Sequence, residues 1–369
     1  MSDQTENILV SPSGFELEAN VPLAPLTTIG IGGPARYYLR ATTNEAIAAA
    51  VEWCRANQVP LFVLGGGSNL LIADDGFSGL VLHVATSGIV VESTDSSSVI
   101  VRVAAGEEWD GFVELAVRNG WAGIECLAGI PGSSGATPIQ NVGAYGQEVS
   151  ETIVRVEALE RTTGAVRSFT NEDCRFRYRE SLFKSEQRDT WVILSVTYRL
   201  VPGGPPTVRY PELARELEER GANDLITVRD TVLEIRRRKG MVLDPRDPDT
   251  RSDGSFFMNP ILKDSDVKPF LERASAGIGL DVAIPRFPAG EGRTKLSAAW
   301  LIENAGFRKG YAMGRAGLSS KHTLAVVNRG GASAAEILAL VRTIQDRVEE
   351  VFGVRLHPEP NFIGFGDGG

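Results

Sequence analysis

Two side chains in this sequence lie on short, stiff segments where they could carry out acid–base chemistry. Ser255, in "SDGSFFMNP", follows a glycine that permits a tight turn, and Pro260 disfavours a helix through the segment. Glu359, in "LHPEPNFIG", lies between two prolines that restrict the backbone and thereby aim its carboxylate. A solvated turn carboxylate fits the same pattern, so Glu359 alone does not specify a site.

The surroundings of Ser255 argue against a serine nucleophile. Such a serine usually needs a neighbouring base, and the histidines of the chain, His83, His322 and His357, lie outside any GxSxG-type motif. The segment also lacks the strand-to-helix elbow that exposes a nucleophilic serine. A hydrolase is therefore a poor interpretation of this sequence.

A third candidate is Arg179 in "CRFRYRESLFK", which directly follows Tyr178. If this stretch is extended, the two neighbouring side chains point to opposite faces. The planar guanidinium of arginine suits the recognition of a carboxylate. From this stretch alone, however, a surface arginine beside a core tyrosine is the more ordinary reading.

Two glycine-rich segments could bind a large ligand. In "VLGGGSNLLI", residues 65–67 leave successive N–H groups free for an anion nest, although a plain tight hairpin fits at least as well. No GK[ST] follows and no helix opens there, so it is neither a Walker loop nor a GxGxxG motif. The second segment, 129–146, is too long and too rich in small residues for a mere connection. Together the two segments suggest a multi-contact ligand such as a dinucleotide.

The elements that would position these residues alternate irregularly along the chain. Thr42 and Glu45 have capping-box spacing before an alanine-rich run, and residues 108–119 also have a helical pattern. The run "TIVRVEALERTTGAVRSFT" predicts a hairpin. Ser333 and Glu336 can cap a last helix, whose apolar stripe is Ile337, Val341, Ile344, Val348 and Val351. Because strands do not alternate regularly with helices, we expect an α+β fold.

Composition limits the classes of function. A chain of 369 residues predicts two or three domains, and a net charge of −9 argues against a nucleic-acid-binding protein. Cys54, Cys126 and Cys174 are far apart, so a zinc site or a disulfide framework is not expected and no metal is predicted. The first residues lack a signal-peptide pattern, and no stretch approaches the roughly 20 apolar residues of a membrane helix. We therefore expect a cytoplasmic protein without membrane insertion.

Taken together, the segments resemble the bacterial UDP-N-acetylenolpyruvoylglucosamine reductases, the MurB family. The resemblance rests on the ordered set "TTIGIGGPA", "LGGGSNLL", "IPGSSGATPIQNVGAYG", "CRFRYRESLFK", "RRRKG", "GSFFMNP", "KLSAAWLIENAGF" and "LHPEPNFIG", which spans nearly the whole chain. It implies an FAD-binding domain pair of the vanillyl-alcohol-oxidase kind plus a separate α+β substrate-binding domain. The expected boundaries are 1–90 for the first FAD-binding subdomain, 91–240 with 345–369 for the second, and 241–344 for the substrate domain.

The resemblance also implies an activity with two half-reactions. NADPH reduces a non-covalent FAD, and the reduced flavin delivers a hydride to the enolpyruvyl double bond of the UDP-sugar to give UDP-N-acetylmuramate. The expected partners are these small molecules, and the protein is expected to be a monomer. Two rivals are an FAD-dependent oxidase of the same flavin-binding superfamily and a catalytically silent nucleotide-binding or scaffold protein.

Roles for individual residues follow from the resemblance. Arg179 and Glu359 would stabilise the carbanion that hydride transfer leaves, and Ser255 would protonate it. Expected substrate contacts are Tyr178, Tyr210, Lys239, Asn259 and His322. Expected FAD contacts are Gly65, Gly66, Gly67, Ser68, Asn69, Gly132, Ser133, Gly135, Ala136, Thr137, Gln140, Asn141, Gly143, Ala144 and Tyr145. One departure is Met258, which stands where many members carry a lysine that could contact phosphate.

Overall fold

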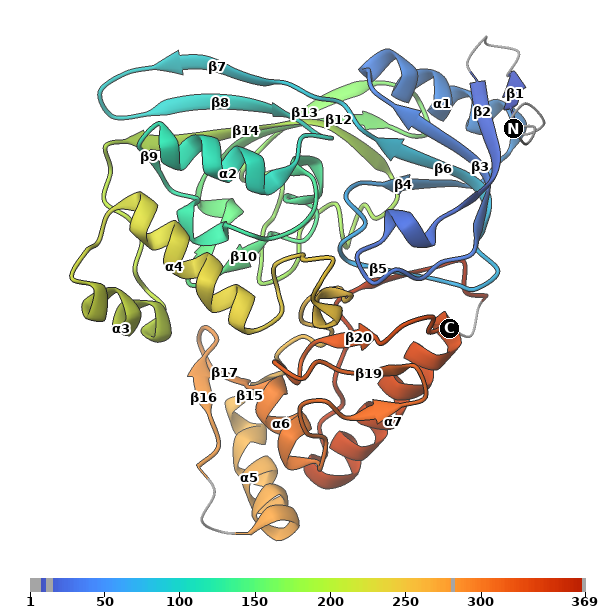
Figure 1. Cartoon of the computed structure of the whole chain (residues 1–369). Coiled ribbons are helices and arrows are strands. Elements are labelled where there is room, and N and C mark those ends of the chain that lie inside the picture. The colour runs from blue at the N-terminus through green and yellow to red at the C-terminus, as the bar shows by residue number, and fades with distance from the viewer. Residues whose placement is uncertain (1–7, 11–15, 280–282, 367–369) are drawn as a thin grey trace. The chain divides into compact units, whose positions relative to one another are not determined.

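The computed structural model describes residues 8–10, 16–279 and 283–366 (Figure 1). Contacts within the chain divide it into two compact units that are built from interleaved segments. Unit 1 comprises Met1–Val21, Pro34–Gly67 and Phe77–Arg238. Unit 2 comprises Pro22–Gly33, Ser68–Gly76 and Lys239–Gly369.

The first sheet of unit 1 has the strand order β1-β2-β3-β6-β4. Its strands are β1 (Ile8–Val10), β2 (Glu16–Pro22), β3 (Pro34–Ala41), β6 (Phe77–Val84) and β4 (Leu61–Leu64). Both β3 and β4 run parallel to β6, and the helix α1 (Asn44–Asn57) provides the long connection that parallel strands require. The cap of α1 is Thr43, whose side chain accepts a hydrogen bond from the Ala46 N–H at 3.2 Å, and not Thr42 as the spacing suggested. Thr43 still has an extended backbone, so the helix begins one residue later than expected.

The second sheet of unit 1 is antiparallel and has the order β13-β12-β14-β8-β7. Its strands are β7 (Ile89–Thr94), β8 (Val99–Ala104), β12 (Ile153–Glu160), β13 (Val166–Thr170) and β14 (Trp191–Pro202), and β9 (Trp121–Ala122) pairs with the end of β14. The expected hairpin is confirmed as β12 and β13, joined around Gly164, which has φ +75°.

Helices and short 3-10 turns of unit 1 complete its core. The helices are α2 (Trp109–Arg118), α3 (Pro211–Arg220) and α4 (Leu225–Arg238), and the short turns are η2 (Glu125–Leu127), η3 (Ser134–Ala136) and η4 (Val149–Glu151). The expected helix at 108–119 is confirmed as α2, which buries Trp109, Phe112 and Val113. A small hairpin of β10 (Gly143–Ala144) and β11 (Gln147–Glu148) closes the glycine-rich segment 129–146.

Unit 2 contains short sheets around a helical core. The strands β5 (Leu70–Ile72) and β21 (Asn361–Ile363) pair in parallel. The other two sheets have the orders β15-β17-β16 and β18-β19-β20, with β15 (Ile261–Lys263), β16 (Arg286–Pro288), β17 (Arg293–Leu296), β18 (Ala312–Met313), β19 (Ala316–Leu318) and β20 (Val326–Asn328). The helices are α5 (Asp264–Ile278), α6 (Ala298–Asn304) and α7 (Ala334–Phe352), with the short turns η1 (Ala24–Leu26) and η5 (Pro248–Thr250).

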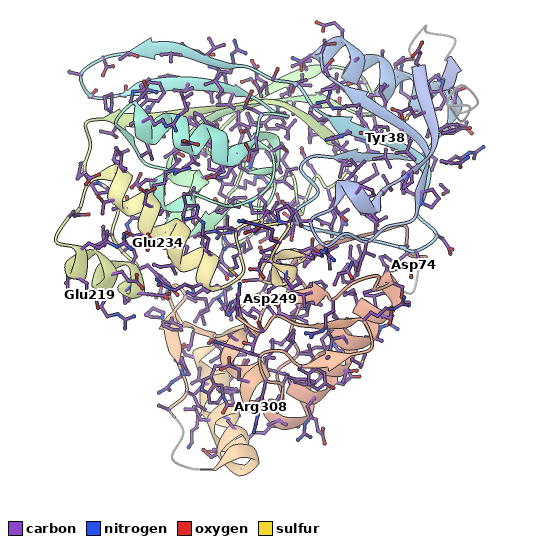
Figure 2. All side chains as sticks on the ribbon, viewed as in Figure 1. Tyr38, Asp74, Glu219, Glu234, Asp249 and Arg308 are labelled. Atoms are coloured by element: carbon purple, nitrogen blue, oxygen red, sulfur yellow. The ribbon has the colours of Figure 1, made fainter. Side chains whose placement is uncertain are left out.

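The last helix confirms the capping box and the apolar stripe. The Ser333 side chain accepts from the Glu336 N–H while the Glu336 carboxylate accepts from the Ser333 N–H. Asp74, labelled in Figure 2, accepts from the Ala334 and Ala335 N–H groups at 2.7 and 3.1 Å. The stripe residues lie in the core of unit 2, with Val351 only partly buried. A helix whose first N–H groups are all paired is well anchored at its start.

The three-part division expected from the sequence stays a prediction, and its outermost residues, 1–7, 11–15 and 367–369, lie outside the described residues. The structure groups the chain into two units instead of assigning a third boundary. Within unit 2, the end of α7 and residues up to Leu356 pack in the same core as Phe256 and Phe257.

Candidate functional site

The glycine turn at 65–67 is pressed against the second glycine-rich segment inside unit 1. A Cβ on Gly66 would lie 2.5 Å from the Gly132 Cα, and a Cβ on Gly65 would lie 2.6 Å from the Ser133 Oγ. Gly67 has φ +64°, a conformation that favours glycine. The strands on either side, β4 and β5, belong to different sheets, so the turn is not the hairpin that the sequence allowed. Glycine is required here because two backbones approach each other.

Segment 129–146 is packed into unit 1 and is not a surface loop. Apart from Gly146, all of its residues are buried or half-buried. The Thr137 hydroxyl donates to the Ser134 carbonyl at 2.7 Å. It also forms a hydrogen bond of 2.7 Å with the Tyr198 hydroxyl. The Ser134 Oγ is buried and has no hydrogen-bond partner among the described residues. A buried hydroxyl without a partner costs free energy, which a polar ligand at this place would recover.

These observations fit a large ligand with polar groups, such as the expected FAD. In this glycine cradle, residues 65–67 against residues 132–133, the absence of side chains lets two backbones approach each other, and Ser134, next in the chain, offers an unused hydroxyl. Ser134 was not among the residues expected from the sequence. Serine is common in turns, so its residue type does not mark Ser134 as a cofactor contact. Its burial does, and burial becomes known only with the fold.

Other expected cofactor contacts are committed within the protein. The Asn141 amide donates to the Glu148 carboxylate and the Arg177 carbonyl, and its oxygen accepts from the Ser150 N–H at 3.1 Å. This amide therefore holds segment 129–146 in shape. Tyr145 packs edge-on against Tyr210, with ring centroids 5.3 Å apart.

Two of the expected contacts fall in the other unit. The boundary between the units lies between Gly67 and Ser68, so Ser68 and Asn69 belong to unit 2.

Arg179 lies at the tip of a tight turn, so the stretch is not extended there. Arg177 and Glu180 exchange backbone hydrogen bonds of 2.9 and 3.1 Å, so Tyr178 and Arg179 are the two central residues. Arg179 has φ +56°. Such a turn needs a positive φ, which residues other than glycine adopt at some cost in free energy. Its guanidinium carbon lies 5.3 Å from the Tyr178 ring centroid, so the two side chains do not point to opposite faces.

The guanidinium of Arg179 is also tied to segment 129–146. Its Nη2 donates to the Gly143 carbonyl at 2.6 Å, and its backbone carbonyl accepts from Lys184 Nζ at 3.1 Å. Unit 1 therefore brings together Arg179, Tyr178 and the glycine-rich segment. A strained arginine that is held in place from two sides is typical of a functional position.

In unit 2, Ser255 and Glu359 lie on neighbouring backbone segments. The Phe256 N–H donates to the Leu324 carbonyl at 2.8 Å, and the Phe256 carbonyl accepts from the Glu359 N–H at 2.9 Å. Asn69 accepts at its carbonyl from the Asn361 N–H, and its amide contacts the Glu359 carbonyl at 3.4 Å. These contacts link a serine and a glutamate that are more than 100 residues apart in the sequence.

The expected substrate contacts are spread over both units. Asn259, in unit 2, accepts from the Ala298 N–H at 3.0 Å and so anchors the start of α6. His322 accepts at its carbonyl from the Ala325 N–H at 3.1 Å. Lys239 is the first residue of the third segment of unit 2, directly after α4. Tyr210, in unit 1, is the residue before α3 and remains 42% exposed, which leaves its ring accessible.

Sequence reasoning missed the residues that surround the turn before Ser255. Asp253 is buried beside Thr28, which lies 225 positions away in the sequence. An aspartate before a glycine is a common turn pattern, so no local pattern singles out Asp253.

The cysteines and possible metal ligands form no site in the described part of the chain. Cys54, Cys126 and Cys174 are free and buried. Within that part, no group of three or more His, Cys, Asp or Glu side chains could bind a metal ion. Over the same residues, no helix has both the length and the apolar character that a bilayer span requires.

Comparisons with known proteins agree with the two-part organisation. A family model described as "UDP-N-acetylenolpyruvoylglucosamine reductase, C-terminal domain" matches residues 245–363, and one described as "FAD binding domain" matches residues 35–170. The expected α+β fold, with an FAD-binding part and a separate second part, is thereby confirmed.

Similar proteins cover almost the whole chain. The UDP-N-acetylenolpyruvoylglucosamine reductases of Thermobifida fusca and Streptomyces coelicolor are each 50% identical over 349 residues, 94% of this chain and 97% and 90% of theirs. The crystal structure of the reductase from Thermus caldophilus has a TM-score of 0.62 at 26% identity and covers 93% of this chain and 97% of its own. The chain belongs to the family of UDP-N-acetylenolpyruvoylglucosamine reductases.

Proposed function

We propose that this protein reduces the enolpyruvyl double bond of UDP-N-acetylglucosamine enolpyruvate to UDP-N-acetylmuramate, a step in peptidoglycan precursor synthesis, with FAD as cofactor and NADPH as reductant. The observation that carries the proposal is the 50% identity to reductases of this name over 94% of the chain. The cradle of glycines in unit 1 and the pairing of the Ser255 and Glu359 segments in unit 2 support it.

The proposed cofactor contacts are the glycines of the cradle with the rest of the expected set and Ser134. When bound, FAD would supply the hydride chemistry, with NADPH as the source of the hydride and the terminal carbon of the enolpyruvyl group as its acceptor. The protein then has to stabilise the negative charge that develops at the α-carbon and spreads into the substrate carboxylate. Fixed hydrogen-bond donors and positive charges lower the barrier for such a step.

We assign this stabilisation to Arg179 and Glu359. The turn and the Gly143 contact hold the Arg179 guanidinium in one place, so little reorganisation is needed when charge develops. Glu359 has to be protonated, or share a proton, in order to stabilise an anion.

Ser255 is the proposed proton donor to the α-carbon. A hydroxyl is a weak acid, but a carbanion is a much stronger base than an alkoxide, so the transfer is favourable once the carbanion forms. The backbone bonds around Phe256 fix the position of the preceding hydroxyl. A general acid of this kind accelerates a reaction by about 10²–10⁴-fold.

Substrate binding is proposed for Tyr178, Tyr210, Lys239, Asn259 and His322. Tyr210 would cover the substrate because its ring is partly exposed and rests on Tyr145. Lys239 and Asn259 would lie near the diphosphate. The methionine at position 258 would supply no charge there.

Further parts of the proposal concern the whole protein. We propose that it acts as a monomer in the cytoplasm, without membrane insertion. We also propose the domain boundaries 1–90, 91–240 with 345–369, and 241–344.

The test is an absorbance spectrum of the purified protein, followed by successive additions of NADPH and the enolpyruvyl-UDP-sugar under nitrogen. We expect an oxidised-flavin spectrum that NADPH bleaches and that the substrate restores, with UDP-N-acetylmuramate as product. Rapid reoxidation by air, with no response to the UDP-sugar, would identify an oxidase instead. A colourless protein that releases no FAD on denaturation would indicate a nucleotide-binding or scaffold protein.

A further inference from the structure

Asp253 is a buried carboxyl at the turn that leads to Ser255. It is 7% exposed and is separated from Ser255 by Gly254, which has φ +73°. The Gly254 N–H contacts the Ser252 Oγ at 3.3 Å, which closes the turn. Any change in the charge or hydrogen bonds of Asp253 therefore acts on the backbone that presents the Ser255 hydroxyl.

The hydrogen bonds of Asp253 are few for a carboxylate. The Thr28 hydroxyl lies 2.8 Å from the Ser252 carbonyl and 3.3 Å from Asp253 Oδ1. A hydroxyl has one proton, and the carbonyl can only accept, so the shorter bond uses that proton. The Leu70 N–H is the other donor to this carboxyl, and Oδ2 is buried with no partner among the described residues. This is too little to stabilise a buried negative charge.

Among the residues that the structure describes, no cation compensates this carboxyl. The segments that pack around it are 22–33, 68–76, 250–257 and 324–328. Their charged residues are Asp74, Asp75 and Arg251, and the neighbouring segment before β21 carries Glu359. None of these contributes to the pKa of Asp253, which burial raises to about 8 against the opposing effect of the Thr28 and Leu70 hydrogen bonds. At neutral pH most of the carboxyl is therefore uncharged.

We propose that Asp253 is a positioning residue for proton donation by Ser255, and that it must be uncharged for this step to proceed. A protonated Asp253 can donate to the Thr28 oxygen, whose own proton is used by the Ser252 carbonyl. This arrangement links three segments of unit 2 through one neutral hydrogen-bond chain. The inference rests on the proposed function for its catalytic part only.

Ionisation of Asp253 would have two consequences. The single proton of the Thr28 hydroxyl would then serve either the Asp253 carboxylate or the Ser252 carbonyl, so the turn before Ser255 would lose one of these two hydrogen bonds. A negative charge without a counter-ion would also lie two residues from the place where the substrate becomes negative, which opposes that step. The reduction of FAD by NADPH does not involve proton donation by Ser255 and would be unaffected.

The first test uses stability, which needs no assumption about the reaction. Between about pH 4 and pH 8 the unfolded chain has released the Asp253 proton and the folded chain retains it. The contribution of this group to the free energy of unfolding therefore falls as pH rises through that window and is constant above it. Asp253→Asn cannot ionise. The melting temperature of this variant minus that of the wild type should therefore increase by on the order of 5 °C from pH 4.5 to pH 8.5.

A matched control is Asp249→Asn, in the same unit (Figure 2). Asp249 is also buried, but its oxygens accept from the Ser320 N–H at 3.0 Å and the Ser320 hydroxyl at 2.5 Å. Its substitution should not give a difference that grows toward high pH. Asp253→Ala provides a second non-ionising variant in case the amide of Asp253→Asn disturbs folding.

The second test measures the two half-reactions by stopped flow from pH 6 to pH 9.5. At pH 9 about nine-tenths of Asp253 is ionised, so the rate of flavin reoxidation by the enolpyruvyl substrate in the wild type should be about tenfold below its value at pH 7. Asp253→Asn should lack this decrease, and flavin reduction should be the same in both proteins.

The proposal is overturned if wild type and both Asp253 variants show the same pH dependence of melting temperature, or if the reoxidation profile of Asp253→Asn keeps the high-pH decrease. If the substrate reoxidises none of the proteins at any pH, the proposed function fails. The melting temperatures then still decide whether Asp253 is uncharged.

Discussion

The backbone on both sides of Ser255 is held by bonds that do not involve its side chain. Phe256 is buried and bonded to Leu324 and Glu359 through its backbone groups. Removing the serine hydroxyl should therefore leave the segment folded, so a Ser255 variant can test chemistry without a large change in structure.

We predict that Ser255→Ala keeps the wild-type rate of flavin reduction by NADPH. Reoxidation by the enolpyruvyl-UDP-sugar should fall by at least about 10²-fold, because the general acid is lost. Stopped-flow absorbance of the flavin separates the two half-reactions. Ser265→Ala is a suitable control, since Ser265 is exposed on α5 and should tolerate the change. Fast half-reactions of both kinds in Ser255→Ala would remove Ser255 from the proposed site.

At the scale of residues, the sequence predicts which side chains could do chemistry better than it predicts where those side chains lie. Ser255 and Glu359 were singled out because a glycine before Ser255 permits a tight turn and prolines restrict both segments, and both properties are local. The turn at Tyr178 and Arg179 was missed because it contains neither glycine nor proline. Asp253 was missed because its partner Thr28 comes from a distant segment, and no local pattern encodes that encounter.

The elements that carry the site differ in how strongly the sequence encodes them. The helix α7 was predicted with its cap and its stripe, since both depend on spacings of three and four residues. The hairpin β12–β13 was predicted from another local pattern, two strand-like runs on either side of a short turn. For the glycine turn at 65–67, the sequence allowed both an anion nest and a hairpin. The pairing of β4 with β6 and of β5 with β21 decides against the hairpin and depends on contacts far apart in the chain.

At the scale of elements, we predict that Gly66→Ala disrupts the contact between the two glycine-rich segments. Its Cβ would lie 2.5 Å from the Gly132 Cα, and backbone cannot yield as a flexible side chain can. The cost should be about 1–3 kcal/mol of unfolding free energy, with a lower FAD content after purification. Chemical denaturation and the ratio of flavin to protein absorbance measure the two effects.

The control for this variant is Gly111→Ala in the exposed face of α2. A Cβ there would meet only the end of the Glu108 side chain, at 3.3 Å. Alanine in a helix should be neutral or stabilising by up to about 1 kcal/mol relative to glycine. Equal effects of the two substitutions on FAD content would contradict the proposed role of the cradle.

The whole molecule is organised by a chain that passes repeatedly between its two units. Residues 22–33 and 68–76 supply parts of unit 2 that the long segment after Lys239 lacks. Ile29, Ile31 and Leu71 lie in the core of unit 2. The Asn328 amide, in β20, donates to the Ile29 carbonyl at 3.0 Å.

We predict that residues 239–369 do not fold when they are expressed alone. Such a fragment lacks β5 as the partner of β21, and it lacks Asp74 at the start of α7. Its thermal unfolding, followed by circular dichroism, should show no cooperative transition, whereas the full chain should show one. A sharp transition with near-ultraviolet signals in the fragment would show that the two short segments are dispensable.

The interleaving of segments has a consequence for the history of the gene. A unit made from one continuous stretch can be transferred between genes by a single recombination event, but unit 2 is encoded in three separated stretches. A crossover near codon 239 would bring together β21 and β5, or α7 and Asp74, from different ancestors. Selection for compatible partners should therefore favour the inheritance of both halves of the coding sequence from the same ancestor. Chimaeras between relatives should work best when all three stretches are exchanged at once.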